Sequence, residues 1–305
     1  DNYNVAVGFN AGVLVSTGVQ NTLMGGTTGD ALTTGSENTA LGISALTRDT
    51  AGSKTVAVGG TALAYQNFTT ATDSYNTAVG YAAGLSVSTG STNTFVGGLA
   101  GDSVTSGGGN VYIGFDCAAF QNNATEGDDN VYVGAFARPS AATVDSEIAI
   151  GRYVLGQGTL TATLGINGNG ATISIDGSDT SWAAHSDERL KDNITTSTAG
   201  LSFINDLRPV TYTWKAKNEI SEDFTNYYDA ESSDPVNGTA GKTYHGFVAQ
   251  EVKATIDAHS EIANGNNLWA ERVDDIQQLA PGNLVPMLVK AIQELSAEIE
   301  TLKGG

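Results

Sequence analysis

Ser186 and Lys191 lie five positions apart in the charged stretch HSDERLKDNI, residues 185–194. These residue types can form a nucleophile and a base, because a serine hydroxyl is inert until a neighbouring group accepts its proton. A lysine amine can accept that proton when it is held away from water and from carboxylates. The chain has no G-x-S-x-G elbow with a His–carboxylate set, so Lys191 is the nearest plausible base. The stretch therefore raises the hypothesis of nucleophilic catalysis by a Ser–Lys pair.

The same letters are also typical of the start of a helix. Ser186 or Asp187 can cap the first turn, acidic side chains complement the positive helix N-terminus, and Leu190 can begin an apolar face. On a regular helix, positions five apart differ by about 140° around the axis and do not face each other. A working pair therefore requires a turn or an interrupted helix between Ser186 and Lys191.

Composition argues against several other classes of function. The formal net charge of −19 disfavours a nucleic-acid partner and an anionic membrane surface. One Cys and three scattered His give no disulfide framework and no recognisable metal spacing, so we expect no cofactor and no metal. No apolar run approaches the roughly 20 residues of a spanning helix, so we expect no membrane insertion.

The chain before this stretch is a repeat. Nine copies of an Asn-x-x-aliphatic-Gly pattern are present, and six of the eight intervals between their glycines are 17 residues. The pattern ends at Gly8, Gly25, Gly42, Gly59, Gly80, Gly97, Gly114, Gly134 and Gly151. The two longer intervals indicate surface insertions around 64–75 and 118–129. This regularity predicts a β-roll or narrow β-solenoid, with two short strands and two tight turns in each turn of about 17 residues.

The pattern within one copy predicts how a rung packs. The residue before each Gly is aliphatic and the residue two positions earlier is Val, Ile or Thr. In a strand these side chains share one face, which we expect to turn toward the core. The Asn can bond its own turn and can stack as a ladder along the axis. Rungs of mostly Val and Ala bury little surface, so we expect the roll to be completed by other copies of the chain.

Four side chains that depart from the common residue at their place in the repeat need an interpretation. Cys117 occupies a small position three residues after a Gly, so we interpret it as a buried small hydrophobe and not as a nucleophile. Phe95, Tyr112 and Tyr132 stand two positions before a Gly, where most copies have Ala. They could line a ligand surface, but we expect them to pack against a neighbouring chain.

The composition predicts three parts: a mainly β repeat domain (1–155), a neck (156–185) and an α+β domain (186–305). The neck segment TLTATLGINGNGATISIDG alternates around Asn-Gly turns, which predicts short strands or a hairpin. In the last part we expect a short helix and a strand in 201–215, a solvated acidic loop in 216–243, a strand entering a helix in 244–256, and helices over 271–279 and from 283 on.

The final helix carries a heptad pattern, with Val or Ile at a and Leu at d. It is formed by Val285, Leu288, Ile292, Leu295, Ile299 and Leu302. Lys290 and Glu294 add an i,i+4 pair. The pattern fits a helix packed on its own domain or a coiled-coil-like helix that associates with other copies. We favour association, because the seam spans nearly three heptads.

Repeats of the type NTAVGYAAG, over about residues 4–155, resemble the head repeats of trimeric autotransporter adhesins and similar β-rolls in phage tail fibres. The resemblance implies a homotrimer of parallel chains. The heptad pattern alone would prefer two strands, and we follow the nine repeats.

From about 186 to 303 the chain is similar to the C-terminal intramolecular chaperone domain of phage tail spikes and fibres, a self-cleaving peptidase domain. The similarity runs through SDERLKDNI (186–194), L-x-x-I-N-D-L-R-P-V-x-Y-x-W (201–214), HGFVAQEV (245–252) and LVPMLVKAIQEL (284–295). It implies that the domain assists trimer folding and then cuts its own chain once, as a serine endopeptidase with a Ser–Lys dyad.

Carried over to this sequence, the resemblance implies that His185–Ser186 is the scissile bond, Ser186 the nucleophile and Lys191 the general base. The residues expected to support them are Asp187, Arg189 and Leu190, which match the motif and would position it, and His245 and Gln250, for which we expect packing or a hydrogen bond to the motif.

The resemblance further implies a virion component, a tail fibre assembled in the host cytoplasm whose mature form contributes to host attachment through a surface glycan or protein. Two alternatives stay open. A bacterial trimeric surface adhesin would need a secretion signal and a membrane anchor. A purely structural trimer would use SDERLK only to cap a helix.

Overall fold

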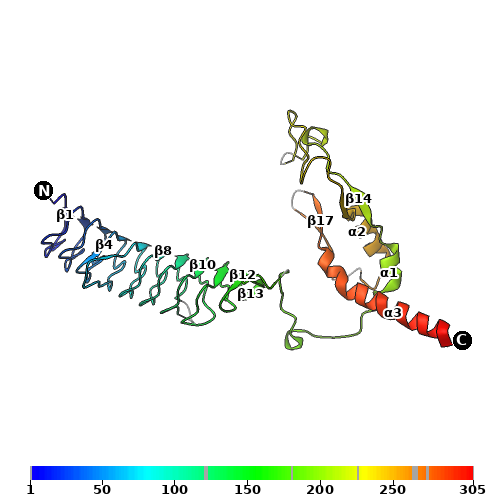
Figure 1. Ribbon diagram of the computed structural model, residues 1–305, viewed down its shortest axis with the longest axis horizontal. Helices are drawn as coiled ribbons and strands as arrows, with labels where there is room; N and C mark the ends of the chain where they lie inside the picture. The colour runs from blue at the N-terminus through cyan, green and yellow to red at the C-terminus, as the bar shows by residue number, and fades with distance from the viewer. Residues whose placement is uncertain are drawn as a thin grey trace. The chain divides into compact units, whose positions relative to one another are not determined.

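The computed structural model describes residues 2–119, 123–179, 181–224, 227–262, 267–272 and 275–304. The chain divides into two compact units, Asp1–Leu190 and Lys191–Gly305, and Figure 1 shows the elements of each. The domain limits expected at 155 and 185 stay predictions.

The first unit is a solenoid in which each rung adds one three-residue strand to a single sheet. The strands are β1 (Val5–Val7), β2 (Thr22–Met24), β3 (Thr39–Leu41), β5 (Val56–Val58), β7 (Thr77–Val79), β8 (Thr94–Val96), β9 (Val111–Ile113), β10 (Val131–Val133) and β11 (Ile148–Ile150). Neighbours pair in parallel, with Val5 opposite Thr22 and so on along the sheet. The predicted solenoid is confirmed.

The expectation of two strands per rung is wrong for the described residues. A second strand occurs only where β4 (Gly52–Ser53) pairs with β6 (Thr72–Asp73). The remainder of a rung turns through left-handed residues, such as Asn10 (φ 55°) and Thr27 (φ 53°), and such residues interrupt a strand.

A hairpin follows the last rung, as the Asn-Gly pattern predicts. β12 (Thr161–Ile166) pairs in parallel with β11 and antiparallel with β13 (Asn169–Ser174). The two residues between the hairpin strands, Asn167 and Gly168, have φ angles of 53° and 77°. Two positive φ angles are those of the type I′ turn that Asn-Gly favours.

The face of each strand that points into the core is the opposite of the one expected. The middle residue is buried from the second rung onward, and Phe95, Tyr112 and Tyr132 are fully buried within their own chain. The flanking aliphatic side chains stay partly exposed, for example Val7 at 54% and Val96 at 37%. The interior is filled by the middle side chain of each strand, by the small residue three positions after most of the glycines, and by further apolar side chains such as Leu46 and Val87. Packing of the three aromatic side chains on a neighbouring chain is therefore ruled out.

An asparagine ladder runs through the buried interior, as predicted. The backbone N–H of Asn93 donates to Oδ1 of Asn76 at 2.9 Å, and that of Asn110 donates to Oδ1 of Asn93 at 3.0 Å. The Asn93 side-chain amide also donates to the carbonyl of Gly107 at 2.9 Å. Each Asn thus satisfies polar groups of two rungs that have no access to water.

A residue of the first long insertion supplies the hydrogen bonds of this ladder at a rung that lacks its Asn. The fourth copy has Thr55 in place of Asn, and Gln66 of the insertion reaches the same interior. The Gln66 amide donates to Asp49 Oδ2 at 2.6 Å and to Thr55 Oγ1 at 3.0 Å, and its Oε1 accepts from Asn76 at 2.9 Å. The expectation that residues 64–75 form only a surface insertion is therefore wrong. In the second insertion, residues 120–122 lie outside the described residues, and Ala118 and Ala124 are buried.

The second unit is α+β. Its elements are α1 (Leu201–Asp206), β14 (Val210–Tyr212), η2 (Lys217–Glu219), β15 (Tyr244–Gly246), α2 (Ala249–Ala258), β16 (Trp269–Glu271), β17 (Gln277–Leu279), η3 (Pro281–Leu284) and α3 (Val285–Gly304). β14 pairs antiparallel with β15, and the buried core includes Phe203, Val252 and Ile256.

The helix expected over 271–279 is not formed. β16 and β17 instead make an antiparallel pair in which Trp269 lies opposite Leu279, and the Trp269 indole donates to Gln277 at 3.1 Å. Asp275 has a φ of 59°, which a helix does not accommodate. Residues 273 and 274 of this segment lie outside the described residues.

The heptad side chains of α3 do not pack on their own domain. The six of them are 41% to 82% exposed, whereas the helix buries Ala291 and packs Met287 against the core. The Lys290–Glu294 pair is confirmed, with 3.2 Å between Nζ and Oε1. The seam is thus available to a partner.

Candidate functional site: an exposed turn of 3₁₀ helix

The stretch HSDERLKDNI begins two residues after a bridge to the hairpin. Ala183 and Thr172 of β13 exchange two backbone hydrogen bonds of 2.9 and 2.7 Å. From residue 181 to residue 198 every side chain is exposed in the single chain. The predicted His185–Ser186 bond therefore lies in accessible backbone two residues beyond this bridge.

The motif itself forms one turn of 3₁₀ helix, η1 (Glu188–Leu190), closed by the Leu190 N–H on the carbonyl of Asp187 at 3.1 Å. No regular helix follows directly, and the next one is α1 at Leu201. The helix-start interpretation therefore holds for a single turn only. Such an interrupted turn removes the geometric objection that a regular helix raises against a Ser–Lys pair.

Two of the motif residues pair with each other. The Arg189 guanidinium donates to both oxygens of Asp187, at 2.6 Å to Oδ2 and 3.0 Å to Oδ1, and its backbone N–H donates to Oδ1 at 2.9 Å. This hydrogen bonding raises the pKa of Arg189. The pair spans the turn, and the positioning role expected for Asp187 and Arg189 stays a prediction. Leu190 is 73% exposed, so its apolar side chain is not packed within the single chain.

The other expected site residues belong to different parts of the fold. Ser186 lies in the first unit and Lys191 begins the second. His245 lies in β15 opposite Thr211, and Gln250 lies in the first turn of α2. Whether Lys191 meets Ser186, and whether His245 or Gln250 supports them, stays a prediction.

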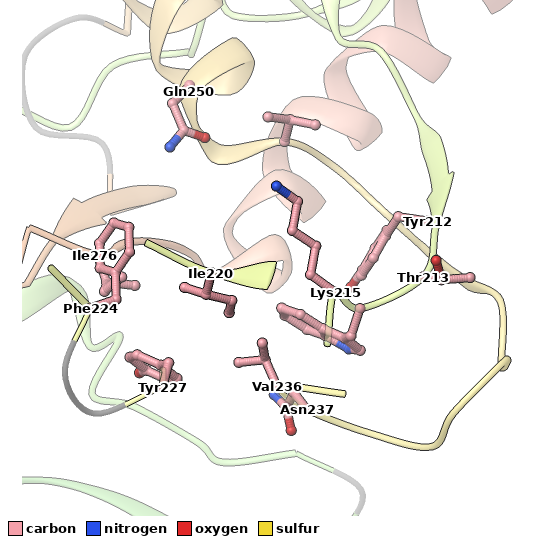
Figure 2. Close-up of a pocket in the computed structure, with 12 residues that line it drawn as sticks. Tyr212, Thr213, Lys215, Ile220, Phe224, Tyr227, Val236, Asn237, Gln250 and Ile276 are labelled. Carbon is pink, nitrogen blue, oxygen red and sulfur yellow. The ribbon is translucent and has the colours of Figure 1, made fainter. Parts of the chain in front are cut away.

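A cavity of about 780 Å³ in the second unit includes Gln250 in its wall. It is lined by Tyr212, Thr213, Trp214, Lys215, Ile220, Phe224, Tyr227, Val236, Asn237, Val248, Gln250 and Ile276. Figure 2 shows Lys215 extending among the aromatic side chains, with its amine on the side of Gln250. Segment 216–243 is therefore more than a solvated loop, because its apolar residues line this cavity together with Trp214. The apolar residues spaced through this acidic segment were the available signal in the sequence.

Within the described residues, no cluster of His, Cys, Asp or Glu could hold a metal ion. None of the helices described is both long enough and apolar enough to cross a membrane. Cys117 is buried, and burial raises the pKa of its thiol to about 12, which keeps it protonated and inert.

Comparison with protein families finds a match that begins at the predicted nucleophile. Residues 186–260 match the family Peptidase_S74, described as "Chaperone of endosialidase". This part of the chain is therefore similar to chaperone-of-endosialidase domains. The family implies autoproteolytic peptidase activity and is associated with trimeric tail fibres. None of the curated proteins compared with the chain matches it.

The chaperone-of-endosialidase domain follows a solenoid of nine rungs, and this combination fits a phage tail fibre with a C-terminal chaperone domain. The order of the two parts agrees with that expected from the sequence. A component of a phage virion is the location that the domain suggests.

Proposed function

We propose that the protein is a homotrimeric tail-fibre segment whose C-terminal domain assists assembly and then cuts the His185–Ser186 bond. The observation that carries the proposal is the position of the family match. It begins at Ser186, in exposed backbone directly after the last bridge to the hairpin. A cut there separates the solenoid from the chaperone domain without breaking a strand or a helix.

The proposed chemistry uses only groups of this chain and water. Lys191 accepts the proton of the Ser186 hydroxyl, and Oγ attacks the carbonyl carbon of His185. The C–N bond breaks, Lys191 returns the proton to the Ser186 nitrogen, and an ester joins His185 to Oγ. Water then hydrolyses the ester to give 1–185 and 186–305. Nucleophile and target share one chain, so proximity supplies much of the rate.

Assembly would activate the motif. In the single chain Lys191 is exposed to water, whereas a lysine that acts as a general base needs a site that excludes water. Leu190 and Ile194 are 73% and 66% exposed and offer apolar surface that neighbouring chains can cover. The exposed α3 seam offers a second contact between copies. Cleavage would then follow trimer formation, and the released fibre could not retrace its folding route, so that its stability becomes kinetic.

Mass spectrometry and sedimentation of the purified full chain test the proposal. The wild type is expected to be trimeric and to yield fragments 1–185 and 186–305, and Ser186→Ala is expected to stay at full length. Ser181→Ala, an exposed serine just before the motif, is the matched control and should cleave normally. An uncut wild type that is folded and trimeric would contradict self-cleavage and favour the purely structural trimer.

A role in host attachment belongs to the same proposal, because tail fibres are the context of this domain. A bacterial surface adhesin remains the alternative. Binding of the released 1–185 fragment to host cells, with a glycan or a protein as receptor, is the measurement that supports attachment.

A further inference from the structure

The solvent side of the nine-strand sheet carries two rows of apolar or threonine side chains. The row one position before each Gly is wholly aliphatic: Val7, Met24, Leu41, Val58, Val79, Val96, Ile113, Val133 and Ile150. The row two positions earlier holds only Val, Ile and Thr. Seven members of the aliphatic row are 37% to 54% exposed. At about 4.8 Å per rung, the rows extend over roughly 40 Å.

A third row, one position after each Gly, borders these two and alternates in size. Phe9, Ile43, Tyr81 and Phe115 are 52% to 78% exposed. The rungs between them carry glycine at this position, as in Gly60, where a Cβ would lie 3.5 Å from both Ile43 and Tyr81. Each large side chain therefore covers the glycine of an adjacent rung. The row presents one large apolar group about every 10 Å.

The three rows, which we call the sheet face, are nearly free of charge. None of the 33 acidic residues of the chain stands in them, and the only charged member is Arg152. Copies of a chain with a net charge of −19 repel one another across an acidic surface. An uncharged apolar patch of this size is rare on a monomer and marks a contact surface. A second copy of the chain presents the same uncharged surface.

We propose that the sheet face is the surface through which copies of this chain pack against one another, in parallel and with equal rungs at equal heights. The inference rests on the proposed trimer and identifies its contact in the solenoid. A ring of three copies closes only if neighbouring copies are not shifted along the axis. A shift of one rung at each of the three contacts would add up to three rungs on return to the first copy. When equal rungs lie at equal heights, the large side chains of the third row from different copies lie at the same level. The glycines of the adjacent rungs leave space for them.

Cysteine cross-linking of the full chain tests the contact directly. Cys117 is fully buried, so a new exposed cysteine is the one that reacts. Val96→Cys, treated with a short bismaleimide, is expected to give covalent dimers on a denaturing gel, because each chain offers one reactive thiol and the reagent joins two thiols. Thr89→Cys, exposed in the same solenoid but outside the sheet face, is the control and should stay a single chain.

A second experiment tests the register. Met24 and Ile113 lie five strands apart in the sheet, about 24 Å along the axis. Co-expressed Met24→Cys and Ile113→Cys chains should give 24–24 and 113–113 links, and the mixed 24–113 link should not form. A trimer by sedimentation with no link at Val96, or with abundant 24–113 links, would overturn the inference. The cleavage products 1–185 and 186–305 report on the proposed function separately.

Discussion

The carboxylate of Glu294 in α3 accepts a hydrogen bond from the backbone N–H of Leu201, the first residue of α1, at 2.7 Å. Gly200 precedes α1 and offers no side-chain cap, and a Cβ there would clash with the Glu294 carboxylate. Within the described residues, the final helix α3 therefore caps α1, the first α-helix after HSDERLKDNI. Contacts with Leu201 and Lys290 lower the pKa of Glu294.

Glu294→Gln is expected to destabilise the second unit, because it removes the negative charge at the start of α1. Because the pKa of Glu294 is lower in the folded state than in the unfolded state, its carboxylate stabilises the folded state fully above pH 4.5, the ordinary pKa of a glutamate. This stabilisation is lost as the pH falls through the folded-state pKa. Chemical unfolding followed by Trp fluorescence measures the loss. Glu298→Gln, on the same helix and exposed, is the control and should leave the midpoint unchanged.

Lys191→Met is expected to stop cleavage while leaving assembly intact, because it keeps the length of the side chain and removes the base. Lys191→Arg should also fail, since a guanidinium does not give up its proton. The yield of fragment 186–305 by mass spectrometry is the measurement. Normal cleavage of Lys191→Met chains would show that another group acts as the base.

Tyr112→Phe and Tyr132→Phe form a matched pair in the solenoid interior. The Tyr132 hydroxyl donates to the buried carboxylate of Glu147 at 2.7 Å, whereas the Tyr112 hydroxyl has no hydrogen-bond partner within the described residues. Loss of the Tyr132 hydroxyl should cost about 1.5–3 kcal/mol in free energy of unfolding, and loss of the Tyr112 hydroxyl should be neutral or stabilising. Equal losses of stability in thermal unfolding would contradict this difference in hydrogen bonding between the two hydroxyls.

Alkaline pH should destabilise the solenoid. Burial raises the pKa of Cys117 to about 12 and raises the pKa values of Tyr112 and Tyr132 above their usual range. In the unfolded chain these groups ionise near pH 9.0 and 10.0, so the unfolded state loses protons first and is favoured as pH rises. Each group should contribute up to about 1.4 kcal/mol per pH unit. Unfolding midpoints between pH 8 and 11 measure the slope, and Cys117→Ala should reduce it.

Gln66→Ala should destabilise the solenoid as strongly as Asn93→Ala, by roughly 2–4 kcal/mol in each case, because both leave buried polar groups without partners. Gln66 bonds Asp49 and Thr55, and Asn93 bonds Gly107 and Asn76. Asn67→Ala, beside Gln66 and exposed, is the control. A mild effect of Gln66→Ala would show that the fourth rung does not depend on the inserted residue.

The period of the repeat by itself determined the solenoid, because nine copies at nearly constant spacing can only stack in register. The Asn-Gly pair determined the hairpin, since its left-handed preference fits one type of turn. The ladder could also be predicted, because seven of the nine copies have an Asn at the same place and each Asn stacks on its equivalent.

Only the tertiary structure decided which face of each strand is inside. Val96 and Phe95 are both apolar, so alternation alone could not show that Phe95 fills the interior and Val96 faces out. The same holds for Gln66, whose role depends on a gap that Thr55 leaves in a neighbouring rung. The pairing of β16 with β17 depends on contacts between residues on either side of Asp275, which a helical pattern in single letters does not include. The sequence thus determined the periodicity and the local turns, and the narrow interior decided how the side chains are divided between core and surface.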